Sequence, residues 1–239
     1  MRHISAPIRD EGAGARVRRL FPSTELRWPA TDPFLLFDEF FVAAHAGFPD
    51  HPHRGFEIIT YMLEGGFQHR DSLGNAVSAP AGHAMHFVTG SGIIHSEMPI
   101  GSAHGIQLWI NLRRTQKAIA PSLRLISPDE MPQHTIEGGY VRRIASPSGP
   151  IVLHTAATYD DVVFNSVGSV SWDVSRESVA LVYVIEGEIK CTDTTIHAGQ
   201  MCVFDGEPAE IQSSSSARAI VLTGQRQHES IRFVGPFVD

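Results

Sequence analysis

Short apolar runs separated by glycine, proline, asparagine and aspartate constrain what this chain can fold into. They occur between about residues 32 and 115, for example in FEIITYML, AMHFV, GIIHSEM and HGIQLWINL. The pattern returns between about residues 162 and 223, in VALVYVIEGEIKC, MCVFD and ARAIVLTG. Such runs, bounded by turn-forming residues, are typical of antiparallel strands. We therefore expect an all-β protein, in which LRRTQKAIA is suited to a short helix.

The chain also shows signs of two related halves. Residues 116–149 loosen the pattern with prolines and glycines, so we expect a connecting region there. The phrase YMLEG at residues 61–65 is echoed by YVIEG at 183–187, and PAGHAMHF at 80–87 by HAGQMCVF at 197–204. Two echoes in the same order predict an internal duplication, although such phrases also recur by chance. We place the domain boundary between residues 130 and 131.

The charge and apolar content of the chain exclude several classes of partner. With 19 Lys and Arg against 26 Asp and Glu, the formal net charge is −7, so we expect no direct nucleic-acid or membrane partner. The short arginine clusters at residues 16–19 and 142–143 are interpreted as solvated faces. The sequence contains no apolar run suited to a secretory signal or a membrane span, which predicts a cytoplasmic protein. Its two cysteines, Cys191 and Cys202, are expected to be buried thiols.

Two pairs of metal-ligand residue types stand at positions i and i+2. They are His51-Pro52-His53 and, about forty residues later, His95-Ser96-Glu97. Because side chains two positions apart project from the same face of a strand, each pair can chelate one ion. A lone His-x-His pair is often only solvent-facing, but two pairs on neighbouring strands predict one shared site. Its proposed ligands are His51, His53, His95 and Glu97.

This set of donors favours a redox-active divalent metal. Imidazole nitrogens with one carboxylate suit Fe(II), Mn(II), Ni(II), Cu(II) or Zn(II), and the absence of a thiolate disfavours a closed structural zinc site. Three histidines and one glutamate leave coordination positions open for a substrate or O₂. Glu57 has the same parity as His51 and His53, so it is a further candidate as ligand, outer hydrogen-bond acceptor or buried general base.

Other histidines lack such a partner. We interpret them as surface residues or as pocket residues whose hydrogen bonds are satisfied. They include His69, His83, His86 and His104.

The segments DPFLLFDEF, HPHRGFEIITYMLEGGFQHRDSLGN, TGSGIIHSEMP and HGIQLWINL together resemble the pirin family. The resemblance is dense from about residue 32 to 112, thinner in GPIVLHTAATYDDV, and visible again in GPFV near the end. It implies a bicupin, with two stacked antiparallel β-barrels and a metal only in the N-terminal barrel, for which iron is our choice by resemblance. It also implies ligand roles for the four residues of the H-x-H and H-S-E motifs, in agreement with the parity argument.

The general cupin pattern fits this chain less well. Glu57 matches the acid of the first cupin motif, but Met85 stands where the second motif places a histidine, so we favour Glu97 as the carboxylate ligand. When the repeat offsets are applied, the ligand positions fall in the second half on residues that cannot hold the same metal. The C-terminal barrel is therefore expected to act as a packing partner, pocket wall or interaction surface. These residues are Asp173, Ser175, Gln212 and Ser214.

The resemblance implies two functions of different classes. Some pirins resemble quercetin dioxygenases, which implies an iron-dependent flavonol 2,3-dioxygenase that releases carbon monoxide, with Glu97 or Glu57 as the proton acceptor. The alternative is a non-enzymatic, redox-responsive regulator that binds transcriptional or metabolic protein partners. We expect a monomer, because two barrels of one chain can cover each other's faces. Candidates for lining a pocket for a flat aromatic substrate, or else for core packing, are Phe48, Phe56, Phe67 and Met98.

Overall fold

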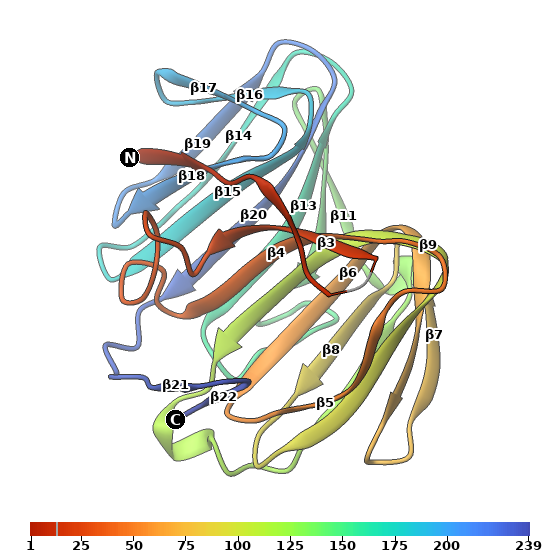
Figure 1. Ribbon diagram of the computed structural model, residues 1–239. Helices are drawn as coiled ribbons and strands as arrows, with labels where there is room; N and C mark the ends of the chain where they lie inside the picture. Colours follow the sequence, from red (N-terminus) through yellow and green to blue (C-terminus); the bar gives the residue numbers. More distant parts are fainter. Residues whose placement is uncertain (13) are drawn as a thin grey trace. The chain divides into compact units, whose positions relative to one another are not determined.

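The computed structural model describes residues 1–12 and 14–239 and confirms the all-β class (Figure 1). The expected short helix is present only as a 3₁₀ turn, η1 (Arg114–Gln116), and a second such turn is η2 (Pro128–Glu130). Among the described residues, no helix has the length and apolar character that crossing a bilayer requires.

The chain divides into two compact units. The first barrel comprises residues 7–30, 34–128 and 227–239, and the second barrel comprises residues 1–6, 31–33 and 129–226. The main division falls between residues 128 and 129, but residues 1–6 belong to the second barrel and residues 227–239 to the first. Strand β1 (Arg2–Ser5) pairs with β18 (Gln200–Asp205) of the second barrel. The final residues join the first barrel, where Val238 N donates to Arg54 O at 3.0 Å.

One antiparallel sheet makes up the first barrel. Its strand order is β10-β8-β6-β9-β4-β3-β2, with β5 pairing with β9 and β7 pairing with β6. The last residues add the small β21–β22 pair. The strands are β2 Ile8–Asp10, β3 Ala15–Phe21, β4 Phe34–Val42, β5 Phe48–His53, β6 Phe56–Asp71, β7 Ala76–Pro80, β8 Ala84–Val88, β9 Ile93–Asn111, β10 Ser122–Ile126, β21 Phe233–Val234 and β22 Phe237–Val238.

Strands β6 and β9 are long enough to bend and to take part in both layers of this barrel (Figure 1). Their pairing is interrupted by irregularities between Met62 and Glu64 and between Gly65 and Phe67. Such bulges kink a strand, and β6 accordingly pairs with β8 before the bend and with β7 after it. Gly65 has a φ of +66°, and a Cβ atom there would lie 1.8 Å from Ser102 O. The bend therefore requires glycine at this position.

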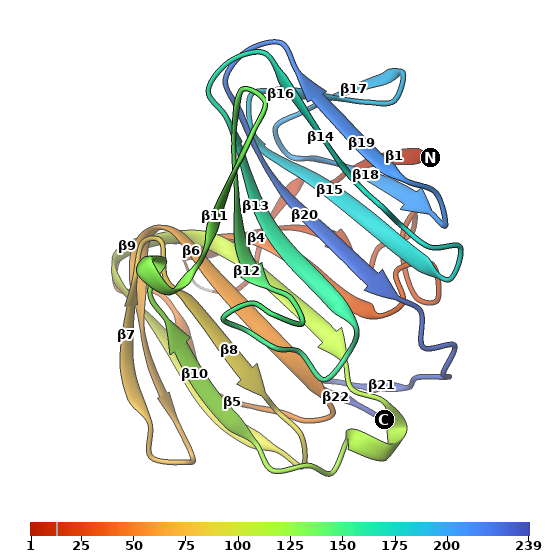
Figure 2. The same cartoon turned by 180° about the vertical axis from the view of Figure 1, so that it is seen from behind.

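The second barrel contains two sheets packed around one hydrophobic core (Figure 2). The larger sheet has the order β1-β18-β15-β20-β13-β12-β11, and the smaller has the order β14-β19-β16-β17. Cys191 and Cys202 lie in the core as free, buried thiols, as expected. The remaining strands are β11 Gln133–Ile136, β12 Gly139–Ala145, β13 Ala157–Phe164, β14 Gly168–Trp172, β15 Ser178–Glu186, β16 Glu188–Cys191, β17 Thr194–His197, β19 Ala209–Ser213 and β20 Ala217–Gln225.

The strand orders of the two barrels support the internal duplication. In each barrel the strand that holds the first echo, β6 or β15, lies between two neighbours. On one side is the strand that holds the second echo, β8 or β18, and on the other side is β9 or β20. The two shared phrases therefore occupy equivalent strands of two similar sheets.

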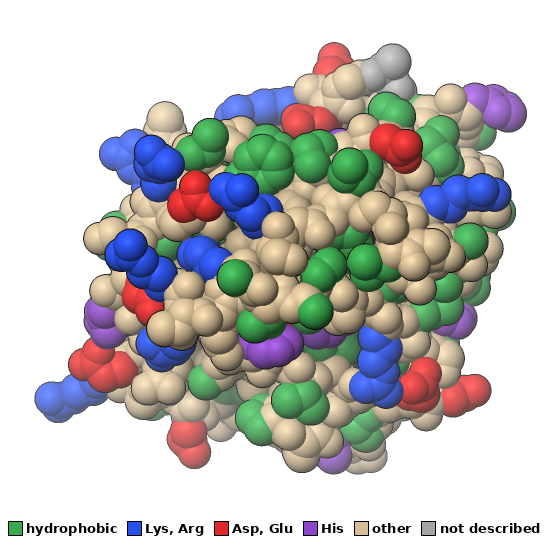
Figure 3. Space-filling view, turned by 90° about the horizontal axis from the view of Figure 1, so that it is seen from below, with side chains coloured by type: hydrophobic (Ala, Val, Ile, Leu, Met, Phe, Trp, Pro, Cys, Tyr) green, Lys and Arg blue, Asp and Glu red, His purple; other side chains and the backbone are tan. Residues whose placement is uncertain are grey.

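Two expectations about the surface and the connection need correction. The stretch at residues 116–149 contains the division between the two units, but it is not loose, because it also contains β10, β11 and β12. The arginine clusters are not simply solvated faces. Arg19 Nη2 donates to Asp38 Oδ2 at 2.7 Å, and Arg143 Nε donates to Asp160 Oδ1 at 2.8 Å, and both carboxylates are buried. On the face drawn in Figure 3, basic and acidic side chains are interspersed rather than gathered.

Candidate metal centre

The first pair of proposed ligands lies on β5, an edge strand next to β9. Register places His51 opposite His95 and His53 opposite Ile93. Pro52 has no backbone N–H to donate, which an edge position tolerates. The rings of His51 and His53 lie 4.8 Å apart, as strand parity predicts for residues at i and i+2.

The three imidazoles converge on one point. Ring centroids are 4.4 Å apart for His51 and His95 and 5.1 Å apart for His53 and His95. One donor nitrogen from each of the three residues lies within 4.8 Å of the others. His53 and His95 are buried at 4% and 1% exposure, while His51 is half-buried. The arrangement leaves one ligand at the edge of the site and two inside.

Glu97 completes the cluster from β9. It is 1% exposed, and a carboxylate oxygen of Glu97 lies within 4.8 Å of donor nitrogens of His95 and His69. Thr60 Oγ1 donates to Oε1 at 3.3 Å, and Gln107 Nε2 donates to Oε2 at 3.1 Å. Burial raises the pKa of Glu97 to about 7, although these two hydrogen bonds favour the charged form. His95 is thus common to both groups of donors.

Two of the imidazoles have their tautomer fixed by backbone carbonyls. His51 Nδ1 donates to Pro49 O at 2.8 Å, and His53 Nδ1 approaches Pro236 O at 3.4 Å. A carbonyl only accepts, so Nδ1 carries the proton in both rings and Nε2 keeps its lone pair. Metal-binding histidines usually donate their second nitrogen in this way.

Among the proposed ligands, His95 is the one whose ring nitrogens lack hydrogen-bond partners in the described part of the chain. Neither its Nδ1 nor its Nε2 has a hydrogen-bond partner among the described residues, although the ring is buried. Burial lowers the pKa of His95 to about 2, with further contributions from His51 and His53, and burial also lowers the pKa of His53 to about 4. Both rings are therefore neutral at physiological pH, as metal ligands must be. A cation bonded to His95 would satisfy one of its orphaned nitrogens, so the donor set fits a metal ion.

Glu57 lies away from this cluster. Phe56 and Ile58 point into the core of the first barrel, so Glu57, which has the opposite parity, projects from the other face of β6. His86 Nε2 lies 3.0 Å from Glu57 Oε1, and both side chains are buried. The structure therefore does not bring Glu57 together with His51 and His53, and the parity argument failed because it counted residues across Arg54 and Gly55, which separate two strands.

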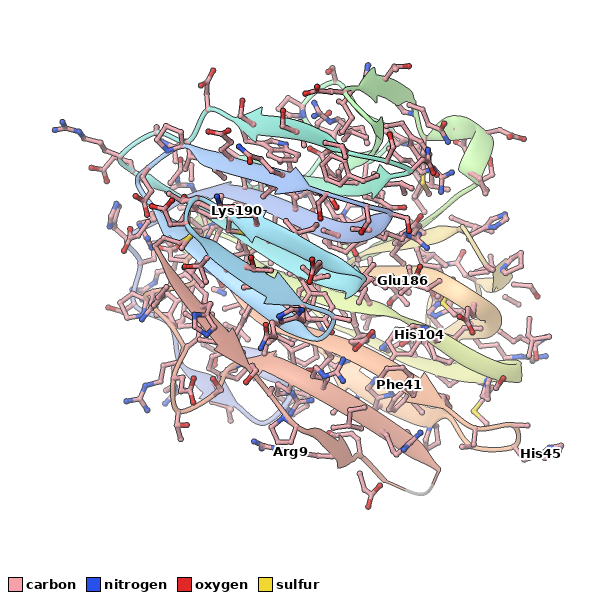
Figure 4. The ribbon with its side chains drawn as sticks, turned by 90° about the horizontal axis from the view of Figure 1, so that it is seen from above. Arg9, Phe41, His45, His104, Glu186 and Lys190 are labelled. Atoms are coloured by element: carbon pink, nitrogen blue, oxygen red, sulfur yellow. The ribbon has the colours of Figure 1, made fainter. Side chains whose placement is uncertain are left out.

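The remaining lone histidines have different surroundings. His104 Nε2 contacts Glu39 Oε1 at 3.0 Å. The His104 ring stacks on that of Phe41, with centroids 4.5 Å apart, and Figure 4 labels both residues. His83 lies in the turn before β8. His86 and His104 therefore fit the expectation of satisfied residues.

The sequence analysis missed His69. This residue is 0% exposed, and its ring centroid lies 5.4 Å from that of His95. Register across β6 and β9 places it opposite Glu97. The signal that could have found it is His69-Arg70-Asp71, one of three pairs at i and i+2 that begin with a histidine.

A cavity of about 390 Å³ opens onto the cluster. Phe48 lines it, as expected, but Phe56 and Phe67 are buried in the core and Met98 is 40% exposed. Trp109 Nε1 donates to Gln107 Oε1 at 3.1 Å, which positions a second aromatic wall. The lining residues are Glu11, Val17, Arg19, Pro22, Leu36, Asp38, Phe40, Phe48, His51, His53, Glu97, Gln107, Trp109, Phe233, Gly235 and Pro236.

The fold and the cluster together define a class of protein. Two cupin domains are present, and the first contains a histidine and glutamate cluster with the donor chemistry of a metal site. This chain is therefore a two-domain cupin.

Comparison with known proteins identifies the family. The pirin family model matches residues 14–110, and the model of the pirin C-terminal cupin domain matches residues 159–239. A pirin-like protein of Solanum lycopersicum is 35% identical over 100% of this chain and 85% of its own length. Pirin of Mus musculus is 34% identical over 95% of this chain and 83% of its own length. The chain belongs to the pirin family.

A solved structure extends the comparison to the fold. It is a quercetin 2,3-dioxygenase of Acinetobacter baumannii, with a TM-score of 0.89 and 25% identity. The match covers 100% of this chain and 90% of that one, so both cupin domains are included.

Proposed function

We propose that this chain is an iron-dependent dioxygenase that opens the central ring of a flavonol such as quercetin and releases carbon monoxide. The observation that carries the proposal is the convergence of His51, His53 and His95 beside a cavity with aromatic walls. Glu97 lines the same cavity and is grouped with His95. The similarity to a structure named as quercetin 2,3-dioxygenase supports the same activity.

In this proposal His51, His53, His95 and Glu97 hold one divalent ion, with Fe(II) favoured. When bound, the ion would supply a Lewis acid and an electron conduit between the flavonol and O₂. Imidazole and carboxylate donors also bind Mn(II), Ni(II), Cu(II) and Zn(II), so the native metal depends partly on availability in the cell. One donor nitrogen from each of His51, His53 and His95 already lies within 4.8 Å of the others.

The cavity suits a flat substrate with polar groups at its edge. Its volume of about 390 Å³ lies within the range of small-molecule sites, about 300–1,000 Å³. Phe48 and Trp109 can contact the faces of aromatic rings, and the Arg19–Asp38 ion pair can bond to hydroxyl groups. These side chains would orient the flavonol so that its 3-hydroxyl group faces the cluster.

Glu97 is the proposed acceptor of the 3-hydroxyl proton. It lines the cavity, and hydrogen bonds from Thr60 and Gln107 hold its carboxylate in place. Glu57 does not line the cavity, so we do not extend the catalytic role to it. Burial of Glu97 also excludes bulk water from the proton transfer.

The test uses protein loaded with Fe(II) under anaerobic conditions and then mixed with quercetin and air. Loss of the flavonol absorbance is followed together with carbon monoxide in the headspace, since quercetin also oxidises slowly by itself. We expect metal-dependent release of about one carbon monoxide per flavonol consumed, as the ring-opening stoichiometry requires. His95→Ala should abolish it, while His83→Ala, in a turn away from the cluster, should not. No metal-dependent carbon monoxide release from the wild type contradicts the proposal.

A redox-responsive regulator is the second candidate, and one observation favours it. On β9, apolar residues that flank the ligands are exposed to solvent. Ile94, Met98 and Ile100 are 50%, 40% and 50% exposed. Exposed apolar side chains often mark protein-binding surfaces. Oxidation or reduction of the ion would change the charge next to β9, the strand that carries both His95 and Glu97 and these exposed residues. Pull-downs from the source cell with Fe(II)-loaded and Fe(III)-loaded protein test this function, and identical partners in both would contradict it.

We further propose a monomeric protein of the cytoplasm. Size measurement in solution tests the first part, because a mass of 26.2 kDa is expected for the single chain. Fractionation of the source cell tests the second part.

A further inference from the structure

The three imidazoles of the cluster differ in how their second nitrogen is bound. His51 and His53 each place Nδ1 against a backbone carbonyl, at 2.8 and 3.4 Å. Thr60 and Gln107 likewise hold Glu97 in place, because each donates a hydrogen bond to its carboxylate. His95 alone among the four proposed ligands has no such partner among the described residues. If one of its nitrogens binds the ion, the other is left buried with an unmet N–H.

His69 offers the acceptor that His95 lacks. Its Nε2 lies 3.1 Å from Asp71 Oδ2, and a carboxylate only accepts, so Nε2 carries the proton. The lone pair of His69 is therefore on Nδ1, which is buried and has no partner among the described residues. Donor atoms of His69 and His95 lie within 4.8 Å of each other.

Asp71 is held in place independently of His69. Its Oδ1 accepts from the backbone N–H of Leu73 at 2.9 Å and of Asn75 at 3.0 Å, and Oδ2 accepts from Asn75 Nδ2 at 2.8 Å. These bonds tie the carboxylate into the turn between β6 and β7. The orientation of His69 thus depends on a fixed acceptor rather than on a mobile side chain.

We propose that His69, oriented by Asp71, is a positioning residue that accepts a hydrogen bond from the non-coordinating N–H of His95. This inference rests on the metal centre proposed above. This series of hydrogen bonds, from Asp71 through His69 to His95, fixes the tautomer of His95 and increases its basicity as a ligand. Removal of an outer partner of this kind typically weakens metal binding about 10–100-fold.

Metal affinity tests the proposal without recourse to enzymatic activity. The probe is Zn(II), titrated into metal-free protein in competition with a chromophoric chelator. His69→Leu fills the space but accepts no hydrogen bond, so we expect a loss of affinity of about 10–100-fold. His69→Gln can accept through Oε1 and donate through Nε2, so it should restore most of the affinity. His86→Leu, which removes another buried histidine of the same barrel, is the matched control and should bind as the wild type does.

A second measurement does not require any variant to fold. In ¹⁵N-labelled, Zn(II)-loaded wild-type protein, the imidazole ¹⁵N shifts and their one-bond couplings to hydrogen report each tautomer. We expect His69 to be protonated on Nε2 with Nδ1 hydrogen-bonded, and His95 to keep one N–H. Protonation of His69 on Nδ1, or direct bonding of His69 to the ion, would overturn the proposal.

The outcomes separate this inference from the proposed metal centre. If His95→Ala abolishes binding while His69→Leu and the wild type have equal affinity, the positioning role is wrong and the centre stands. Equal weakening by His69→Gln and His69→Leu would also contradict it, because a structural role alone explains that result. If the wild type does not bind Zn(II), the centre itself fails.

Discussion

His51 and His95 lie directly opposite each other on β5 and β9, with their ring centroids 4.4 Å apart. Directly paired residues of antiparallel strands have Cβ atoms about 4.5–5.5 Å apart, so sheet pairing alone brings these rings together. The cluster is consequently formed by the backbone before any ion binds. This preorganisation leads to predictions about affinity, pH and stability.

Loss of a single proposed ligand should weaken metal binding more than loss of an outer partner. His51→Ala and His95→Ala are each expected to reduce Zn(II) affinity by more than the roughly 100-fold upper limit for an outer partner. The chelator competition assay measures this, and His83→Ala serves as a control outside the cluster. Affinity within tenfold of wild type in His95→Ala would show that the ion binds elsewhere.

The stability of metal-free protein should depend on the protonation of Glu97. Its folded pKa of about 7 is above the ordinary value of 4.5, so the folded state binds the proton more tightly than the unfolded state. This contribution is fully present below pH 4.5 and is lost as pH rises through 7. Its upper limit is about 3 kcal/mol.

Comparison with Glu97→Gln isolates that contribution, because the neutral amide does not titrate. Between pH 5 and pH 8, the wild type should lose stability relative to Glu97→Gln in urea unfolding. The lowered pKa values of His53 and His95 act in the opposite direction below pH 6.5 but are shared by both proteins. A difference between the two proteins that does not change with pH would contradict the raised pKa of Glu97.

Arg19 should contribute to stability and to recognition of the substrate. Arg19→Met leaves the Asp38 carboxylate buried without its bidentate partner, at a cost of about 1–3 kcal/mol in the free energy of unfolding. Arg70→Met, on an exposed position of β6, should change it by no more than about 0.5 kcal/mol. If quercetin is the substrate, Arg19→Met should also raise KM. Equal stabilities of the two variants would show that the Arg19–Asp38 pair is unimportant to folding.

The bend of β6 should tolerate only glycine at position 65. Gly65 and Gly74 both have positive φ, +66° and +87°, but only Gly65 would place a Cβ against backbone, at 1.8 Å from Ser102 O. Gly74→Ala should therefore lose about 1–2 kcal/mol from the backbone conformation alone. Gly65→Ala should lose about 3 kcal/mol or more, because the neighbouring strand must also move. Equal losses in denaturant unfolding would mean that β9 adjusts freely.

The class of fold was predicted correctly from the sequence, and the four ligands could be proposed from it, because both inferences depend on local periodicity. Strand parity places His51 beside His53 regardless of tertiary structure. The position of His69 depends on the register between β6 and β9 across two irregularities, which local patterns do not encode. Likewise, Glu57 was misplaced because a short break between β5 and β6 changes the face to which it points. The exchange of chain ends between the barrels depends on pairing between residues about two hundred positions apart, such as Arg2 with Val203.

Anomalous diffraction from crystals of metal-loaded protein tests the account most directly. The account predicts one ion per chain, bonded to nitrogens of His51, His53 and His95 and to a carboxylate oxygen of Glu97. An ion bonded elsewhere, or a fully loaded protein with no ion between β5 and β9, would contradict it.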